Sequence, residues 1–397
     1  MKTENIRSYR LRAHHLDQKV SFSGLTDAAG ACGLQNSPPG AWESALFHRV
    51  EGCTLQQLRD AIYRDKILLQ AWSFRGAPVV FPTSQSDIFL TPLLAEKGEE
   101  PWIYTMGITA ALDYVRMSFE DLLSRTMKAA AYLNHHTVKS KEALDRTLAD
   151  IIERELPEEK KKYWRAPSMY GCPDRQTVGD AAVSFLLRPC SFSSRVVFSE
   201  RQGTSPTFTS FRNWTGHEPE TVPDREKELV RKYLHCYGPA TQTSFMGWLG
   251  CSRQQAVRLW NTVSDEMEPV KAGGKERYIL SGDRDALVYA PAAGEKLVLL
   301  GAHDPYLDIK DREIILEDKS LQKIVWRTTA NPGVVLKGGR IAGIWRSRAQ
   351  KNSLEIRITL FETLAEGERK TLQNLAEEYA AFRCQKLKSC KLEIGIF

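Results

Sequence analysis

Apolar and polar positions along the chain repeat one order, in which helical periodicity is followed by two strand-like runs around a turn. The clearest copy covers residues 224–281. Apolar residues recur at helical spacing over 225–237, and Gly238 and Pro239 end that helix. The other predicted elements of this copy are helices over 244–249 and 253–263 and strands over 267–271 and 276–280. Short helices followed by a hairpin predict a winged helix.

The same order recurs less clearly in residues 118–212 and 7–82. In the first of these we expect helices over 118–133, 141–154 and 178–187 and strands over 195–198 and 207–211. In the second we expect helices over 10–18, 27–33, 41–50 and 55–64 and strands over 68–74 and 77–81. Three such segments predict tandem winged-helix (helix-turn-helix) modules.

The last hundred residues have a different pattern, with short β-rich runs separated by turn residues. The predicted strands are 296–300, 312–316, 323–326, 333–336, 340–345 and 353–360, and an amphipathic helix is predicted over 366–386. The predicted fold class is therefore α+β, with winged-helix modules and a β-rich, barrel-like C-terminal domain. We expect modules over 1–115, with a catalytic loop, 116–222 and 223–288, and the C-terminal domain over 289–397.

Composition excludes several classes of protein. The chain has 397 residues, of which 42% are hydrophobic and 26% charged, which are globular values. No run has the length of a membrane helix, and residues 1–20 lack the apolar core of a signal peptide. A cytoplasmic, nucleoid-associated location is expected. The net charge of +6, from 55 basic and 49 acidic residues, permits a nucleic-acid partner but does not require one.

The cysteines and histidines show no metal-binding pattern. None of the eight cysteines forms a Cys-x-x-Cys pair, so we expect reduced thiols that lie mostly in the core. His135 and His136 are adjacent and point in different directions if helical, which does not suit a metal pair. The sequence therefore predicts neither a metal nor a cofactor.

Four motifs follow one another in a fixed order along the chain. They are Gly-Leu-Gln-Asn-Ser-Pro at 33–38 with Ala-Leu-Phe-His-Arg at 45–49; the Trp-x-x-Arg-Gly hairpin within 68–76; Tyr-Gly-Pro-Ala-Thr at 237–241 with Phe245, Trp248 and Gly250; and the segments 299–306, 311–312 and 333–346. Together they resemble the winged-helix DNA glycosylases of the AlkZ and YcaQ type. This resemblance covers most of the chain. It implies removal of alkylated purines or interstrand crosslinks from duplex DNA by hydrolysis of the N-glycosidic bond.

The resemblance assigns the chemistry to Gln35, with Ser37 as a second candidate. An alkylated purine is a cationic leaving group, so the enzyme's task is to orient water and to stabilise the sugar cation. A glutamine oxygen can do both, and two side chains separated by one residue project to the same side of an extended backbone. The family has Gln or Asp where this chain has Ser37, and an apolar residue where it has Asn36.

This departure keeps two further functions open. One is a non-catalytic winged-helix DNA-binding protein, either a regulator or a lesion sensor, in which Ser37 marks lost chemistry. The other is a hydrolase that uses Ser37 as nucleophile, which the absence of a Gly-x-Ser-x-Gly elbow argues against. The glycosylase is the favoured function.

Candidate DNA contacts lie on the predicted hairpin of the first module and on the third module. Trp72 is equally suited to the core of the hairpin and to stacking on DNA, whereas Arg75 at the turn suits phosphate. In the third module the predicted recognition helix offers Arg253 and Arg258, and the wing offers Lys271, Lys275 and Arg277. We expect a monomer bound to double-stranded DNA, with no membrane partner.

Overall fold

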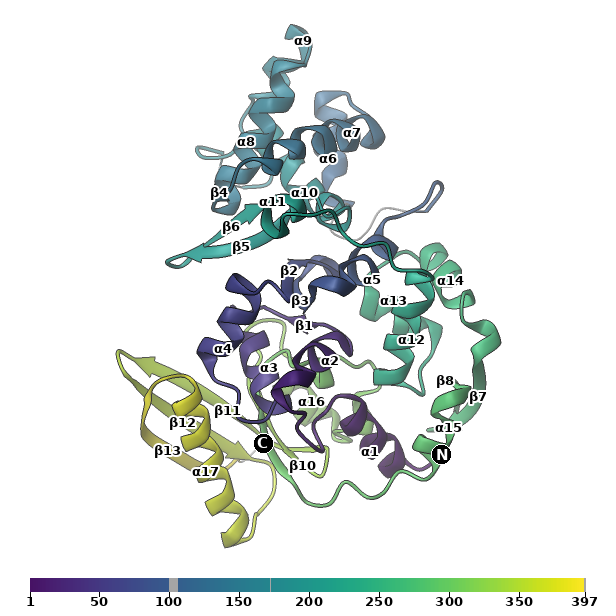
Figure 1. Cartoon of the computed structure of the whole chain (residues 1–397), viewed down its shortest axis with the longest axis vertical. Helices are drawn as coiled ribbons and strands as arrows, with labels where there is room; N and C mark the ends of the chain where they lie inside the picture. Colours follow the sequence, from purple (N-terminus) through teal and green to yellow (C-terminus); the bar gives the residue numbers. More distant parts are fainter. Residues whose placement is uncertain (100–105, 172, 396–397) are drawn as a thin grey trace. The chain divides into compact units, whose positions relative to one another are not determined.

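A computed structural model describes residues 1–99, 106–171 and 173–395 (Figure 1). Tertiary contacts divide the chain into two units. The first comprises Met1–Ala61, Val230–Phe245 and Val263–Phe397, and the second comprises Ile62–Leu229 and Met246–Thr262. Each unit is therefore built from segments that are distant in sequence. The division into four consecutive modules stays a prediction.

Helices make up the N-terminal part of the first unit. Its elements are α1 (Thr3–Ala13), α2 (Leu25–Gly30), β1 (Leu34–Gln35), α3 (Ala41–Arg49) and α4 (Leu55–Arg59). Thr54 begins α4 with a capping box, in which its hydroxyl accepts from the Gln57 amide while the Gln57 side chain accepts from the Thr54 amide. A π-turn over Asp60–Arg64 continues this helix, so the predicted helix over 55–64 is confirmed.

A five-stranded sheet forms the C-terminal part of the first unit, in the order β13-β12-β11-β10-β9. Its elements are β9 (Leu297–Leu300), β10 (Gly333–Lys337), β11 (Arg340–Gln350), β12 (Ser353–Leu360), α17 (Glu366–Phe382) and β13 (Lys386–Ile394). Strands β12 and β13 are parallel, and the other neighbours are antiparallel. Buried residues of α17, such as Leu372 and Ala376, share a core with Trp345 and Ile358, so the helix covers one face. The predicted barrel is wrong, because the described sheet is open.

Three predicted elements of this region differ from the structure. Residues 312–316, predicted as a strand, begin with a 3-10 turn over Arg312–Ile314. The predicted strand 323–326 lies mostly in helix α16 (Lys319–Val325), which Asp318 begins by accepting from the amides of Ser320 and Leu321. The closing helix ends at Phe382 and not near residue 386, and the strand β13 that follows was not predicted.

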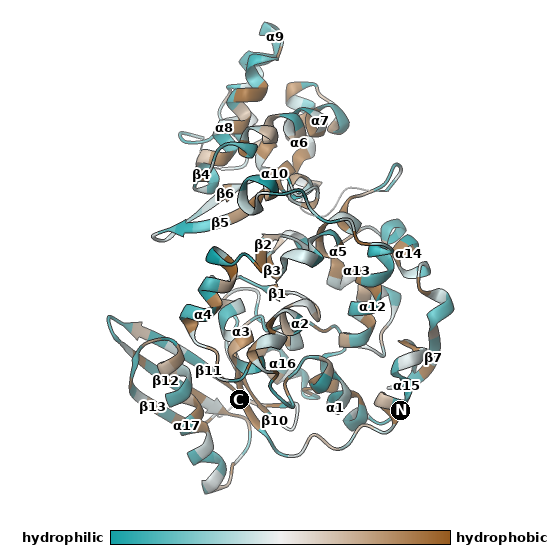
Figure 2. Cartoon of the chain, in the orientation of Figure 1, coloured by the Kyte–Doolittle hydropathy of each residue, from teal (hydrophilic) through white to brown (hydrophobic). Residues whose placement is uncertain are grey.

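The second unit packs helices against a curved row of strands in the order β3-β2-β5-β6-β4. Its strands are β2 (Leu68–Trp72), β3 (Pro78–Pro82), β4 (Val138–Lys139), β5 (Val197–Gln202) and β6 (Ser205–Thr209), and its helices are α5 (Ser86–Leu90), α6 (Thr109–Val115), α7 (Phe119–Ala129), α8 (Lys141–Arg154), α9 (Glu158–Trp164), α10 (Val178–Phe192), α11 (Phe211–Thr215) and α14 (Arg253–Asn261). One core joins apolar residues of α7, α8 and α10 to Trp72 and Phe208 of the strands. The free end of the β5–β6 hairpin is hydrophilic (Figure 2).

The elements predicted for residues 224–281 are all present. Helices α12 (Arg225–Tyr237), α13 (Gln242–Leu249) and α14 are followed by the antiparallel hairpin of β7 (Met267–Ala272) and β8 (Lys275–Leu280), and the short helix α15 (Arg284–Val288) comes next. Gly273 and Gly274 form the turn with positive φ values of 57° and 72°, which glycine adopts without strain. This is the element order expected of a winged helix. None of the described helices has the length and apolar character of a transmembrane segment.

Candidate active site and nucleic-acid interface

The loop over residues 35–40 carries the predicted catalytic residues. Gln35 ends the short strand β1 and is partly exposed, whereas the next residue, Asn36, is 7% exposed. The Asn36 Oδ1 atom accepts a hydrogen bond of 2.7 Å from the Gly40 amide, which closes the loop. Gly40 has φ +90°, a conformation that favours glycine. The polar residue at the inward position of this motif therefore has a structural role.

The three residues at the start of the loop differ in exposure. Gln35 is partly exposed, Asn36 is buried and Ser37 is exposed. The two residues on which the predicted chemistry depends therefore both reach the protein surface at least in part.

A buried ion pair fixes the helix that follows the loop. Arg49 at the end of α3 donates to both carboxylate oxygens of Asp304, over 2.8 and 2.7 Å, and to the Ala45 carbonyl over 2.9 Å. The two side chains are 2% and 1% exposed. Burial opposes ionisation of Asp304, but the Arg49 guanidinium outweighs it and lowers the pKa of the carboxyl. Two of the family-like motifs are therefore joined by one buried pair.

A second buried arginine organises the Tyr-Gly-Pro segment. Arg10 of α1 donates to the carbonyls of Tyr237, Gly238 and Pro239 and forms a bidentate pair with Asp311. The Arg10 side chain is 2% exposed, and its bonds satisfy carbonyls that the end of α12 leaves without helical partners. This segment of the motif is thus held from within the first unit.

Arg277, predicted on the wing as a DNA contact, belongs to the same network. Its side chain is 6% exposed and pairs with Asp311 and with Glu313. A guanidinium that is buried and paired within the protein does not present its charge to a phosphate. The assignment of Arg277 to the DNA surface is therefore corrected to a structural role. Lys271 and Lys275 on the same hairpin are exposed.

A pocket of about 310 Å³ lies beside the 35–40 loop in the first unit. Pro38, Pro39 and Gly40 line one side, and Arg346 and Arg383 are among the residues of its wall. Arg383 is paired with Glu43 of α3 over 2.6 Å. The loop that carries Gln35 and Ser37 therefore borders a hollow with basic side chains.

Trp72 and Arg75 have different surroundings in the second unit. Trp72 is 5% exposed and stacks on Phe208, with ring centroids 5.2 Å apart, so it belongs to the core and not to a surface that stacks on bases. Arg75 is partly exposed, and its guanidinium donates to the Trp248 carbonyl. Its backbone packs so closely on Gly250 that a Cβ there would lie 2.9 Å from the Arg75 Cα. Arg75 thus supports the motif glycine.

The two arginines predicted on helix α14 also differ. Arg258 is 22% exposed and lies within 2.7 to 3.4 Å of three carboxylates, those of Glu96, Glu99 and Glu226. Its charge is neutralised within the second unit, which corrects its assignment to phosphate contact. Arg253 at the start of the helix is exposed and remains a candidate.

A row of basic residues that the sequence did not reveal crosses the C-terminal sheet. The register places Arg346 of β11 opposite Arg357 of β12, and Arg357 beside Lys391 of β13. All three are exposed, and their neighbours Trp345 and Ile358 belong to the core with α17, so the row lies on the other face. The alternation in 386–394 is the signal that would have revealed β13 and hence the row.

Comparisons with known proteins give the relatives of the chain and its fold. The model of the family described as DNA glycosylase AlkZ-like matches residues 28–382. A relative from Streptomyces sahachiroi, the interstrand DNA cross-link repair glycosylase, is 23% identical over 357 residues, which cover 85% of this chain and 86% of the relative. The solved structure of Streptomyces sahachiroi DNA glycosylase AlkZ has the same fold, with a TM-score of 0.76, 18% identity and 99% coverage of both chains.

Proposed function

Because the chain belongs to the DNA glycosylase AlkZ-like family, we propose that it hydrolyses the N-glycosidic bond of alkylated or bulky-adducted purines, including crosslinked ones, in duplex DNA. The chain is a DNA glycosylase, and the family match favours this function over the non-catalytic DNA-binding protein. Damaged purines as substrates are consistent with the cross-link repair for which the Streptomyces relative is named.

In the proposed mechanism Gln35 orients the water that attacks the anomeric carbon. Its side-chain oxygen accepts a hydrogen bond from the water and faces the positive charge that develops on the sugar. The departing purine carries a positive charge before the bond breaks, so it needs little protonation. Ser37, two residues further along the loop, supplies a second acceptor. These roles need no group beyond the protein and water.

In the first unit the proposed DNA contacts are Lys271 and Lys275, which the sequence predicted, and the sheet row Arg346, Arg357 and Lys391, all exposed. Like charges placed opposite each other on neighbouring strands repel, and bound phosphates would relieve this repulsion. In the second unit the proposed contacts are Arg253, which is exposed, and Arg75, which is partly exposed.

The domain organisation and assembly belong to the same proposal. Winged-helix modules over 1–115, 116–222 and 223–288 would present their hairpins to DNA, and the element order of the third module supports this. We propose that the chain acts as a monomer associated with the nucleoid. Size-exclusion chromatography with light scattering tests the monomer, and a mass of two chains would contradict it.

The observation that carries the mechanism is that Gln35 and Ser37 are both at least partly exposed, on either side of the buried Asn36. The test is base excision from duplexes that carry either a ring-methylated purine or an interstrand crosslink. Wild type and the control Gln56→Ala, an exposed glutamine on α4, should yield abasic product. Gln35→Ala should bind the duplex and yield little. Binding by wild type without product from any lesion would contradict the proposal.

A further inference from the structure

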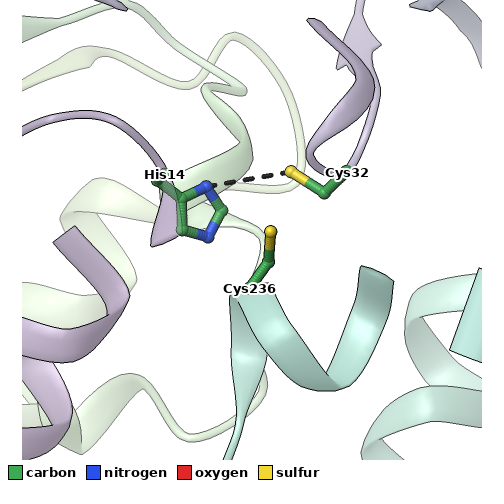
Figure 3. A group of neighbouring side chains, drawn as sticks. All are labelled: His14, Cys32 and Cys236. Atoms are coloured by element: carbon green, nitrogen blue, oxygen red, sulfur yellow. Dashed lines mark hydrogen bonds between the residues drawn. The ribbon is translucent and has the colours of Figure 1, made fainter. Parts of the chain in front are cut away.

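Three metal-ligating side chains meet in the core of the first unit, away from the 35–40 loop's exposed face. Within the described residues, His14, Cys32 and Cys236 are the one group whose donor atoms lie close enough to share an ion, all within 4.8 Å of one another. The side chains converge on a common point (Figure 3). All three residues are buried, and they come from segments more than 200 residues apart at the extremes.

Each side chain is held in place by its own element. His14 ends α1, and its ring packs edge-on against Tyr237 and Tyr306, with centroids 5.1 and 5.6 Å away. Cys32 follows α2, and Cys236 lies in the last turn of α12. The cluster is therefore assembled from the ends of α1 and α12 and the turn between α2 and β1.

The polar atoms of the cluster are only partly satisfied by the chain. The His14 Nδ1 atom lies 3.8 Å from the Cys32 Sγ atom, but His14 Nε2 is buried and has no hydrogen-bond partner among the described residues. A buried ring nitrogen without a partner costs free energy, so its retention requires an explanation. A bound cation would supply one.

The donor set is selective for thiophilic ions. Two sulfurs and an imidazole nitrogen form a Cys₂His zinc ligand set, which keeps a fourth position for water, and hard ions such as Mg²⁺ prefer oxygen. Because His14 Nδ1 already hydrogen-bonds to Cys32 Sγ, Nε2 is the ring nitrogen left to bind an ion.

We propose that His14, Cys32 and Cys236 form a structural site for a thiophilic divalent cation of the Zn²⁺ class. The fourth position of a tetrahedral ion would be taken by a small donor such as water. The site joins the end of α1, the start of β1 and the end of α12. Cys32 stands three residues before Gln35, so a bound ion would fix the start of the loop. The sequence spacing predicted no metal site, because the ligands are distant along the chain.

The test uses the full chain, reduced, stripped with a chelator and titrated with Co²⁺ or Zn²⁺. Co²⁺ should bind with one ion per chain and give a thiolate-to-cobalt charge-transfer band, which Zn²⁺ displaces. Cys32→Ser and Cys236→Ser should lose the band, and His14→Ala should bind at least tenfold more weakly. Cys384→Ser, which removes an exposed thiol, should behave as wild type.

A second measurement needs no variant. Zn²⁺ should raise the melting temperature of the wild-type chain, because an ion that binds only the folded form stabilises it. Substoichiometric Co²⁺ binding, a band that persists in Cys32→Ser, or no effect of Zn²⁺ on the melting temperature would overturn the site. A reduced protein that binds no ion but forms a Cys32–Cys236 disulfide on oxidation would also overturn it. None of these outcomes bears on base excision, which is tested separately.

Discussion

The buried pair of Arg49 and Asp304 makes a strong prediction about stability. Asp304→Asn keeps the size of the side chain but removes its charge. Both carboxylate oxygens accept from Arg49 in the wild type, over 2.7 and 2.8 Å. The substitution replaces one of them with an NH₂ group, which donates and does not accept. The guanidinium is then left buried, at 2% exposure, without a counter-ion. The first unit should become markedly less stable.

The expected loss follows from the surroundings of the pair. Breaking a buried ion pair by removing one partner costs about 3–5 kcal/mol. Arg49 keeps its bond to the Ala45 carbonyl and one acceptor on the new amide, which places the estimate near the lower end, about 3 kcal/mol. The double variant Arg49→Met/Asp304→Leu should lose less than Asp304→Asn, because no charge then stays buried.

Urea unfolding followed by tryptophan fluorescence measures both losses. The pH dependence gives an independent check. Since Arg49 lowers the pKa of Asp304 in the folded state, its stabilisation is present above the unfolded pKa of about 3.9 and is lost as pH falls through the lower folded value. Asp304→Asn should reduce this acid sensitivity. Equal urea midpoints for wild type and Asp304→Asn would refute the reasoning, as would a double variant less stable than the single one.

Three other predictions follow from side chains that the fold places clearly. Burial lowers the pKa of His48 to about 3. The free energy of unfolding of wild type should therefore fall by about 2 kcal/mol between pH 6.5 and pH 5, and His48→Gln should reduce this fall in urea unfolding. Parallel pH profiles for the two proteins would contradict the prediction. Arg357→Ala and Lys391→Ala should each weaken duplex binding and reduce the slope of the logarithm of the association constant against log salt concentration by about 1. Arg258→Ala should lower stability and leave this slope unchanged. Equal slopes for all variants would exclude the sheet row as a DNA contact. Trp72→Ala should cost about 3–5 kcal/mol of stability without changing the affinity of the folded protein for DNA, and a selective loss of affinity would restore the stacking role.

Local signals predicted most elements with clear punctuation. The helix over 225–237 and the strand over 353–360 have the predicted bounds, because periodicity and turn residues agree there. Residues 323–326 were misassigned, since a short apolar run suits a strand or a helix equally. The N-cap residue of this helix, Asp318, lies five residues before Lys323, outside the apolar run. Closure of a barrel depends on long-range pairing of strand edges, which no local pattern reports.

The site was predicted less completely than the fold. Gln35 and Ser37 stay predicted catalytic residues, and side-chain type alone did not separate exposed cations from internal ones. Arg258 and Arg277 looked like phosphate contacts until their carboxylate partners, distant in sequence, were in place. The cluster around Cys32 was invisible for the same reason. Burial and pairing of charges are tertiary properties that the sequence of one element does not contain.

The most direct test of the proposed mechanism is the single-turnover rate of base excision by Gln35→Ala, measured on a duplex that carries one ring-methylated purine. The loss of an oriented water should slow excision at least about 100-fold while duplex affinity stays unchanged, and Gln56→Ala should match wild type. A Gln35→Ala variant that excises the base at the wild-type rate would contradict the assignment of the chemistry to this loop.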